Sequence, residues 1–337
     1  MSKFNTQPIG GSPAFLAILD LISHSAALDH TVLVVGERGT GKAMAAGRLH
    51  FLSPRWEQTF VAVNCAAYDD AALDAYIFGE DISAGLIEQG EDGTLFLDSI
   101  ESVSLRLQEK LLRLIEDGEF RRVRGDETLT SNIRVIAAAG IDLPAAARAG
   151  AFRPDLLDRL SVDVITMPPL RRRMSDIETL ANYFARERVK TVGGQSFPGF
   201  TPEVIEYLKA QSWPGNVRQL RSVAERAVNE AMLDDNSFAG PVGEVILDPF
   251  DAPWRLSAAL PEAAPHQEEV TPKAQIKDIS VAPSPGAGFH DRVNAFEKAM
   301  VVQALKAHDN HQGRAAKSLD LSYHAFRGQL RKHGLRK

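Results

Sequence analysis

Runs of consecutive apolar residues recur along the first half of the chain, and segments with helical periodicity separate them. Residues 107–118 are one such helical segment, with Gly118 at its end. Continuous rather than alternating hydrophobicity is typical of strands that are buried on both faces of a parallel sheet. The pattern therefore predicts an α/β fold in which helices cover both faces of a parallel sheet. The expected strands span residues 31–36, 60–65, 94–98, 133–140 and 162–167.

The strand pattern stops near residue 171, and amphipathic helices follow it. Residues 176–190 and 201–213 have apolar positions at helical spacing, and Thr201 stands where a helix cap is expected. We therefore expect residues 1–170 to form an α/β nucleotide-binding subdomain and residues 171–248 to form a helical lid.

The composition changes again after the lid. Residues 249–288 are rich in Pro and Ala and have no sustained periodicity, which predicts a linker. Residues 289–337 then form a separate module. This tail contains ten Lys/Arg against four Asp/Glu, a balance of +6, so the net charge of −6 leaves −12 on residues 1–288. A basic tail on an acidic body favours contact with a polyanion.

Two further features concern location. No stretch approaches the length of a membrane-spanning helix, and the amino terminus lacks the apolar core of a signal peptide. Cys65 is the single cysteine, which suits a reducing compartment. We expect a cytoplasmic protein without a membrane partner.

A glycine-rich loop follows the first predicted strand and precedes a predicted helix. Its pattern, glycine, four residues, glycine and lysine, allows backbone N–H groups to surround a phosphate, with a lysine charge beside them. Ala43 stands where Ser or Thr usually contacts magnesium. The alternative is a glycine-rich turn with an incidental lysine. The candidate nucleotide-binding residues are Gly36, Glu37, Arg38, Gly39, Thr40, Gly41, Lys42 and Ala43.

Asp98 ends the third apolar strand, 56 residues after Lys42. A carboxylate at this place can hold Mg²⁺ through water beside bound phosphates. The alternative is a helix cap after a core strand. Ser99 follows it, where nucleotide-hydrolysing enzymes commonly have the glutamate that handles the attacking water.

Eight strings in order carry a resemblance to one family: GERGTGK, VNCAA, IFGE, GTLFLD, LQEKLLRLIEDGEFRRV, FRPDLLDRL, PPLRRRMSDI and WPGNVRQL. The chain resembles the AAA+ domain of bacterial enhancer-binding proteins that activate sigma-54 RNA polymerase, and within that family the activators of phage-shock operons. The resemblance spans roughly residues 8–250. It implies ATP and Mg²⁺ as cofactors and assembly into a hexameric ring.

The resemblance also implies roles for individual residues. Asn64 would couple nucleotide state to movement, and Arg218 would be the sensor arginine of the lid. Arg153 and Arg159 match the arginines that reach a neighbouring subunit's site. From the residues alone, these two could equally be surface ion-pair partners. We expect Asn216 to cap the helix that carries Arg218.

Three departures from the family pattern affect the regions that hydrolyse ATP and transmit its effect to sigma-54. Ser99 replaces the glutamate, although Glu101 lies two residues further on. Only 13 residues, 80–92, separate the IFG and GTLFLD strings, so the GAFTGA loop that touches sigma-54 is absent. Ala139 and Gly140 stand where the family has a Thr-Asn pair. The sequence thus favours retained ATP binding and makes contact with sigma-54 doubtful.

The tail predicts an all-α Fis-type helix-turn-helix. An apolar stripe over 293–305 suits pairing with another copy. Ala315 and Ala316 allow close helix crossing, and Phe326 and Leu330 are spaced for a core. The alternative is a basic, solvated helical hairpin. The candidate DNA-binding residues are Ser322, which also caps the second helix, Tyr323, His324, Arg327, Arg331 and Lys332.

Two functions remain open from the sequence. The first is a transcription regulator that binds double-stranded DNA at an upstream activating sequence, hydrolyses ATP and remodels RNA polymerase. The second binds ATP for assembly but does not hydrolyse it productively or contact sigma-54. By resemblance, both would form hexameric rings and DNA-binding dimers, and a phage-shock inhibitory protein is an expected partner.

Overall fold

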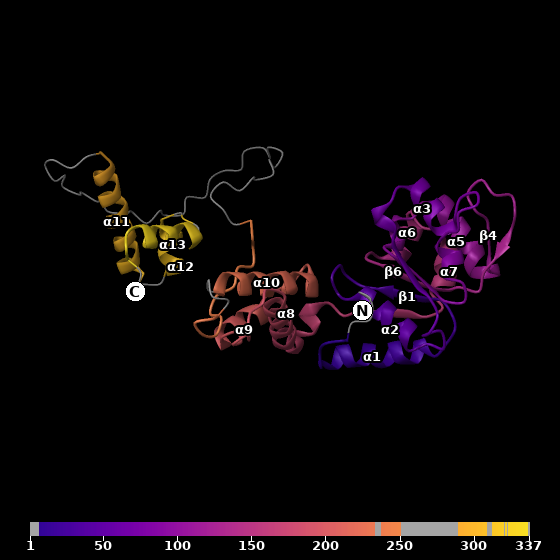
Figure 1. The fold of residues 1–337 in the computed structure, drawn as a ribbon, viewed down its shortest axis with the longest axis horizontal. Coiled ribbons are helices and arrows are strands. Elements are labelled where there is room, and N and C mark those ends of the chain that lie inside the picture. Colours follow the sequence, from indigo (N-terminus) through magenta and orange to yellow (C-terminus); the bar gives the residue numbers. More distant parts are fainter. Residues whose placement is uncertain are drawn as a thin grey trace. The chain divides into compact units, whose positions relative to one another are not determined.

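The computed structural model describes residues 7–232, 237–250, 289–308, 312–319, 321 and 323–335. The chain forms two compact units, Met1–Ile246 and Leu247–Lys337 (Figure 1). Within the described residues, no helix is long and apolar enough to cross a membrane.

The first unit is built on a sheet of five parallel strands in the order β2-β3-β6-β1-β7. All five predicted strands are confirmed to within two residues at their ends. The continuous apolar character of the three inner strands reflects burial on both faces, whereas the two edge strands are partly exposed. The strands are β1 (Val32–Val35), β2 (Phe60–Asn64), β3 (Thr94–Asp98), β6 (Arg134–Ala139) and β7 (Val164–Thr166).

Helices cover both faces of this sheet, as the sequence predicts. Alternate residues of one strand enter different cores: Val32 and Val34 pack toward α1 and α2, whereas Leu33 packs toward the other face. Cys65 is buried in the core of that second face. The helices of this part are α1 (Pro13–Ala26), α2 (Lys42–Phe51), α3 (Asp70–Phe78), α4 (Leu86–Gln89), α5 (Leu105–Asp117), α6 (Leu143–Arg148) and α7 (Pro154–Leu160).

Short elements complete the α/β part. A two-stranded antiparallel hairpin, β4 (Glu119–Phe120) and β5 (Leu129–Thr130), follows α5. Gly118 ends α5 with φ of 70°, as its place in the sequence predicts. The 3₁₀ turns are Cys65–Ala67, Ile100–Ser102, Leu170–Arg172 and Met174–Asp176.

The lid consists of α8 (Ile177–Thr191), α9 (Pro202–Lys209) and α10 (Asn216–Ala231). Thr201 caps α9, because its hydroxyl accepts a hydrogen bond from the Val204 N–H at 3.5 Å. The expectation that Asn216 caps α10 is wrong: Gly215 holds the cap position, and Asn216 is the first helical residue. Its side chain makes tertiary contacts instead.

The second unit contains α11 (Phe289–Ala307), α12 (Gln312–Ser318) and α13 (Tyr323–Lys332). These helices share a core that includes the predicted residues Ala315, Ala316, Phe326 and Leu330. Part of the apolar stripe on α11 is used inside the unit, since Val301 is buried, whereas Phe296 is 42% exposed. The predicted cap Ser322 lies outside the described residues.

Candidate nucleotide-binding site

The glycine-rich loop connects β1 to the amino end of α2. Gly36, Gly39 and Gly41 have φ values of 154°, 81° and 105°, which side chains rarely allow. Gly39 is constrained further, because a Cβ there would lie 2.3 Å from the carbonyl oxygen of Gly215 in the lid. The loop therefore presents backbone to the amino end of a helix, an arrangement that favours anionic ligands.

Lys42 begins α2 and supplies the cation of this loop. Its Nζ donates to the carbonyl oxygens of Gly36 at 2.8 Å and Glu37 at 3.3 Å. Burial lowers the pKa of the Lys42 ammonium, and Asp98 and Glu101 act in the opposite direction. The ammonium of Lys42 is thus bonded to neutral carbonyl oxygens. Charged phosphate oxygens would form stronger hydrogen bonds with it.

Asp98 lies at the carboxyl edge of the sheet. It is in register with Asn64 of β2 and with Ala138 of β6. The turn that follows β3 starts after Ser99, so Asp98 is not a helix cap. The Asn64 side chain accepts a hydrogen bond from the Ala66 N–H at 3.1 Å. The carboxyl edge of a parallel sheet is where α/β folds bind ligands.

A cleft of about 720 Å³ opens at this edge, between the glycine-rich loop and the lid. Ligand sites commonly have volumes of roughly 300–1,000 Å³. The cleft brings together predicted residues from four separate segments: Arg38, Gly39, Gly41, Lys42, Ala43, Asn64, Asp98 and Arg218. Ser99, Glu101 and Gly140 also line it.

The lid contributes residues that sequence reasoning missed. Phe184 of α8 and Val217 and Arg221 of α10 line the cleft beside Arg218. The Arg221 guanidinium lies 5.9 Å from the Phe184 ring centre. Helical spacing offered a signal for Arg221, because it follows Arg218 by three residues and so shares its face. No comparable signal marks Phe184.

Three residues of the glycine-rich loop do not line the cleft, namely Gly36, Glu37 and Thr40. The Glu37 carboxylate accepts hydrogen bonds from Arg171 at 2.8 Å and from Asn216 at 3.1 Å. These two bonds, with Arg171 the larger influence, lower the pKa of Glu37 to about 2. Thr40 bonds to the Glu37 carbonyl oxygen within the loop, at 2.9 Å, and Glu37 joins the loop to the lid.

Arg153 and Arg159 lie away from the cleft of their own chain. Arg153 precedes α7 and pairs with Asp155 at 2.7 Å. Arg159 donates to Glu116 at 2.6 Å. Both are surface ion pairs in one copy of the chain, and both side chains are partly exposed, at 32% and 58%. They are therefore accessible to another copy.

The shortened segment between α3 and α4 forms a tight, closed turn. Glu80 and Ser83 exchange two backbone hydrogen bonds, of 3.1 and 2.8 Å. Val123, from the β4–β5 connection, bonds to both Gly79 and Asp81 through its backbone. Ile82 at the tip is 94% exposed. No long flexible loop projects here, because the backbone is bonded at each end and from the side.

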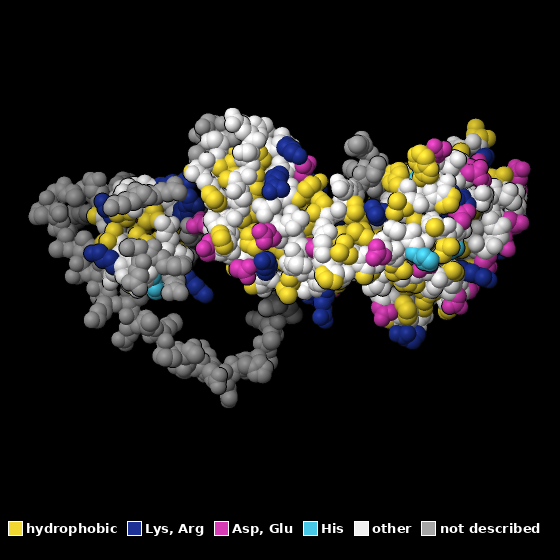
Figure 2. Space-filling view, turned by 90° about the horizontal axis from the view of Figure 1, so that it is seen from below, with side chains coloured by type: hydrophobic (Ala, Val, Ile, Leu, Met, Phe, Trp, Pro, Cys, Tyr) yellow, Lys and Arg dark blue, Asp and Glu magenta, His cyan; other side chains and the backbone are white. Residues whose placement is uncertain are grey.

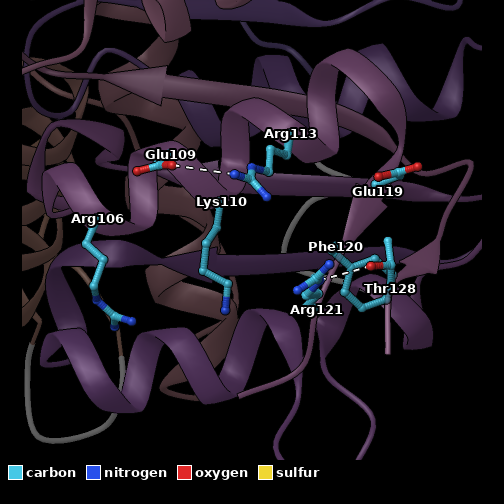
Figure 3. A pocket seen from close by; sticks show the side chains of 8 residues that line it. All are labelled: Arg106, Glu109, Lys110, Arg113, Glu119, Phe120, Arg121 and Thr128. Atoms are coloured by element: carbon cyan, nitrogen blue, oxygen red, sulfur yellow. Dashed lines mark hydrogen bonds and ion pairs between the residues drawn. The ribbon is translucent and has the colours of Figure 1, made fainter. Parts of the chain in front are cut away.

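A second pocket, of about 290 Å³, lies between α5 and the β4–β5 hairpin (Figure 3). It contains none of the predicted site residues. Its basic side chains already have partners: Arg106 pairs with Asp74 at 2.9 Å, Lys110 also pairs with Asp74, and Arg121 donates to Thr128. It therefore differs from the first cleft, where the lysine contacts only backbone carbonyls.

The second unit carries the predicted DNA-binding residues on α13. Arg331 and Lys332 are exposed, and Lys332 donates to Glu297 of α11 at 2.6 Å. Arg327 is partly buried. Tyr323 and His324 belong to the helix, but their side chains, like all of Ser322, lie outside the described part.

Known proteins resemble the chain over nearly its whole length. The model of the "Sigma-54 interaction domain" matches residues 9–166, and that of the "AAA+ ATPase lid domain" matches residues 171–237. The chain is 38% identical to the Psp operon transcriptional activator of Escherichia coli, covering 99% of each chain. It is 33% identical to the regulatory protein AtoC of E. coli, covering 96% of this chain and 67% of AtoC.

A solved structure is similar as well. The crystal structure of NtrX from Brucella abortus in complex with ATP has a TM-score of 0.68 and 26% identity. The match covers 97% of this chain and 70% of NtrX. The same protein has been solved in complex with ADP.

Proposed function

Because the chain belongs to the family of sigma-54-dependent transcriptional activators with an AAA+ domain, we propose that it is a DNA-binding transcription regulator that binds ATP. The observation that carries this proposal is the convergence of Lys42, Asp98 and Arg218 on one cleft. The loop, the strand end and the lid each supply charged side chains there. This is the arrangement that a nucleoside triphosphate requires.

The residues of the cleft fit ATP and Mg²⁺. The loop of positive-φ glycines, with its lysine, suits the phosphates. Mg²⁺ is usually held by one or two carboxylates together with phosphate oxygens, and Asp98 supplies such a carboxylate. The ATP-bound and ADP-bound structures of NtrX support nucleotide binding at this kind of fold.

The position of the two arginines supports self-assembly. Neither Arg153 nor Arg159 lines the cleft of its own chain, and both are exposed enough to reach a nucleotide bound in another copy. This supports a ring, of which a hexamer is the form that we propose. Arginines supplied in trans would make turnover depend on assembly.

The second unit is the proposed DNA-binding part, acting at an upstream activating sequence as a dimer. It carries the excess of positive charge, whereas the drawn face of the first unit has acidic and basic side chains interspersed (Figure 2). Charge concentrated on a small helical unit supports phosphate contacts. The proposed location is the cytoplasm, and a phage-shock inhibitory protein is a proposed partner.

The closed turn at Glu80–Ser83 favours a second candidate function. A regulator with this turn would bind ATP and DNA but would not push a long loop against sigma-54. Remodelling of sigma-54 RNA polymerase would then be altered or absent, even though the nucleotide cleft is intact.

One experiment tests both candidates. The full chain is incubated with promoter DNA, sigma-54 RNA polymerase and ATP, and open complexes, bound DNA and bound ATP are measured. ATP-dependent open complexes support the activator, and binding of both ligands without open complexes supports the second candidate. Absence of ATP and DNA binding would refute both. A Lys42→Ala variant should lose ATP binding and leave DNA binding by the second unit in place.

A further inference from the structure

The chain turns sharply after β3 and brings a glutamate into the cleft. Ser99 has φ of 61° and ψ of 50°, the left-handed conformation, so the strand ends there. A 3₁₀ turn, Ile100–Ser102, follows, and Ile100 is fully buried. Because Ile100 anchors the turn in the core, Glu101 is carried to the opposite side, where it lines the cleft with Lys42 and Asp98.

The two carboxylate oxygens of Glu101 have different surroundings. Oε1 accepts a hydrogen bond from the Gly140 N–H at 3.0 Å. Oε2 is buried and has no hydrogen-bond partner among the described residues. A buried carboxylate oxygen without a partner is costly. Its position in a ligand cleft indicates that the missing partner is a water molecule or a ligand group.

Gly140 makes this arrangement possible. A Cβ at position 140 would lie 3.1 Å from Glu101 Oε1, closer than most side-chain contacts allow, and 4.0 Å from Lys42 Nζ. The absence of a side chain at position 140 therefore permits the observed position of Glu101. The space that a side chain at 140 would occupy is used by the carboxylate of Glu101.

We propose that Glu101 is the general base for ATP hydrolysis in this chain, in place of a glutamate at position 99. This inference rests on the proposed ATP binding. The water oxygen forms a bond to the γ-phosphorus, while the bond from that phosphorus to the β,γ-bridging oxygen breaks and its electron pair leaves with ADP. Glu101 accepts one proton of the water, and inorganic phosphate is released.

A purely structural role is the competing explanation, since Glu101 also holds the backbone at Gly140. The substitution Glu101→Gln distinguishes the structural role from the general-base role. The amide oxygen of Gln can still accept a hydrogen bond from the Gly140 N–H, but the side chain cannot accept a proton from water. The matched control is Glu57→Gln, the same chemical change on an exposed residue in the loop before β2.

The experiment measures steady-state ATP hydrolysis across a pH series and binding of a fluorescent ATP analogue, on the full chain. General-base assistance is worth about 10²–10⁴ in rate, so Glu101→Gln should lower kcat by at least about 100-fold. Analogue affinity should change by less than about threefold, and bound ATP rather than ADP should be recovered from the variant. Gly140→Ala should also lower kcat, by displacing the carboxylate.

Three outcomes would overturn the proposal: an unchanged kcat in Glu101→Gln, an equal loss in Glu57→Gln, or a wild-type chain that binds the analogue without turnover. In the last case ATP binding would stand and only the role of Glu101 would fail. A wild-type chain that does not bind the analogue would instead refute the proposed function.

Discussion

The side-chain amide of Asn216 donates a hydrogen bond to the carboxylate of Glu37 at 3.1 Å. This bond joins the first residue of the lid helix α10 to the glycine-rich loop. Asn216 also donates to the Arg38 carbonyl oxygen at 3.0 Å and accepts from the Leu170 N–H at 2.8 Å. Asn216 is fully buried; its bond with Leu170 is buried, and its two bonds with the loop are partly buried.

Replacing Asn216 with Ala should loosen this junction. Each buried hydrogen bond contributes about 1 kcal/mol. Asn216 also has φ of 49°, and the left-handed conformation costs Ala roughly 1–2 kcal/mol. Together these terms amount to about 4–5 kcal/mol, so we expect the free energy of unfolding to fall by about this amount in urea titrations and the affinity for ATP to fall as well. Asn182→Ala, on the partly exposed side of α8, is the control and should leave both unchanged. Unaltered stability in Asn216→Ala would contradict the role of this junction.

A buried ion pair fixes the amino-terminal segment to the start of the lid. Asp176 accepts from the N–H groups of Gly11 and Ser12, both at 2.7 Å, and pairs with Arg173 at 2.9 Å. Both side chains of the pair are almost fully buried. Removing one partner of such a pair costs about 3–5 kcal/mol. Asp176→Asn should therefore destabilise the first unit by this amount in thermal or urea unfolding. Glu187→Gln, which breaks an exposed pair with Lys190, should cost less than about 1 kcal/mol.

Low pH should remove the contribution that Asp176 makes to the free energy of unfolding. Burial alone would raise the pKa of Asp176, but the hydrogen bonds from Ser12, Gly11 and Arg173 outweigh burial and lower it below 3.8. A carboxyl with a lowered pKa stabilises the fold above its unfolded-state pKa, and this stability is lost as the pH falls through the folded-state pKa. We expect wild-type stability to decline below about pH 4. The stability of Asp176→Asn should decline less steeply over the same range, and parallel pH curves would contradict the assignment.

The sheet was predictable from the sequence because each strand contains a run of consecutive apolar residues, which is typical of strands in a covered parallel sheet. The glycine-rich loop and Asp98 were predictable because their chemistry depends on local spacing and on a strand end. The contacts of Asn216 were not, because its side chain bonds to residues far away in the sequence. Helix-cap preference depends only on the local backbone. At Asn216, tertiary contacts determine the hydrogen bonds of the side chain instead.

The geometry of Glu101 depends on long-range structure in the same way. The sequence places a glutamate two residues after Ser99, but nothing in it reveals the left-handed backbone at Ser99. The hydrogen bond to Gly140 joins residues 39 positions apart. Glu101, two residues after the first departure at Ser99, thus contacts Gly140, which belongs to another departure.

DNA binding should depend on the exposed cations at the end of α13. If Arg331 neutralises a phosphate, Arg331→Ala should weaken binding to all DNA sequences and reduce the slope of log affinity against log salt by about 0.9. Lys298→Ala is the matched control, because it removes a charge from α11 without altering α13. Fluorescence anisotropy with labelled duplexes over a salt series measures both. An unchanged slope in Arg331→Ala would exclude it as a phosphate contact, and deletion of residues 289–337 should abolish binding.

Whether Arg159 acts in a neighbouring copy can be decided by mixing two inactive variants. Lys42→Ala should lose its own nucleotide site, and Arg159→Ala should lose the arginine that it presents to another copy. In an equal mixture, random assembly pairs an intact Lys42 with an intact neighbouring Arg159 at roughly one quarter of all sites, so about that share of wild-type ATP hydrolysis should return.

The matched control mixes Lys42→Ala with the double variant Lys42→Ala and Arg159→Ala, in which no site has an intact lysine, and it should recover nothing. If Arg159 served the site of its own chain, the first mixture would also stay inactive. If Arg159 were only the surface partner of Glu116, at 2.6 Å, Arg159→Ala would keep full activity before any mixing. Recovery in the first mixture alone therefore requires that the site be completed by a second copy of the chain.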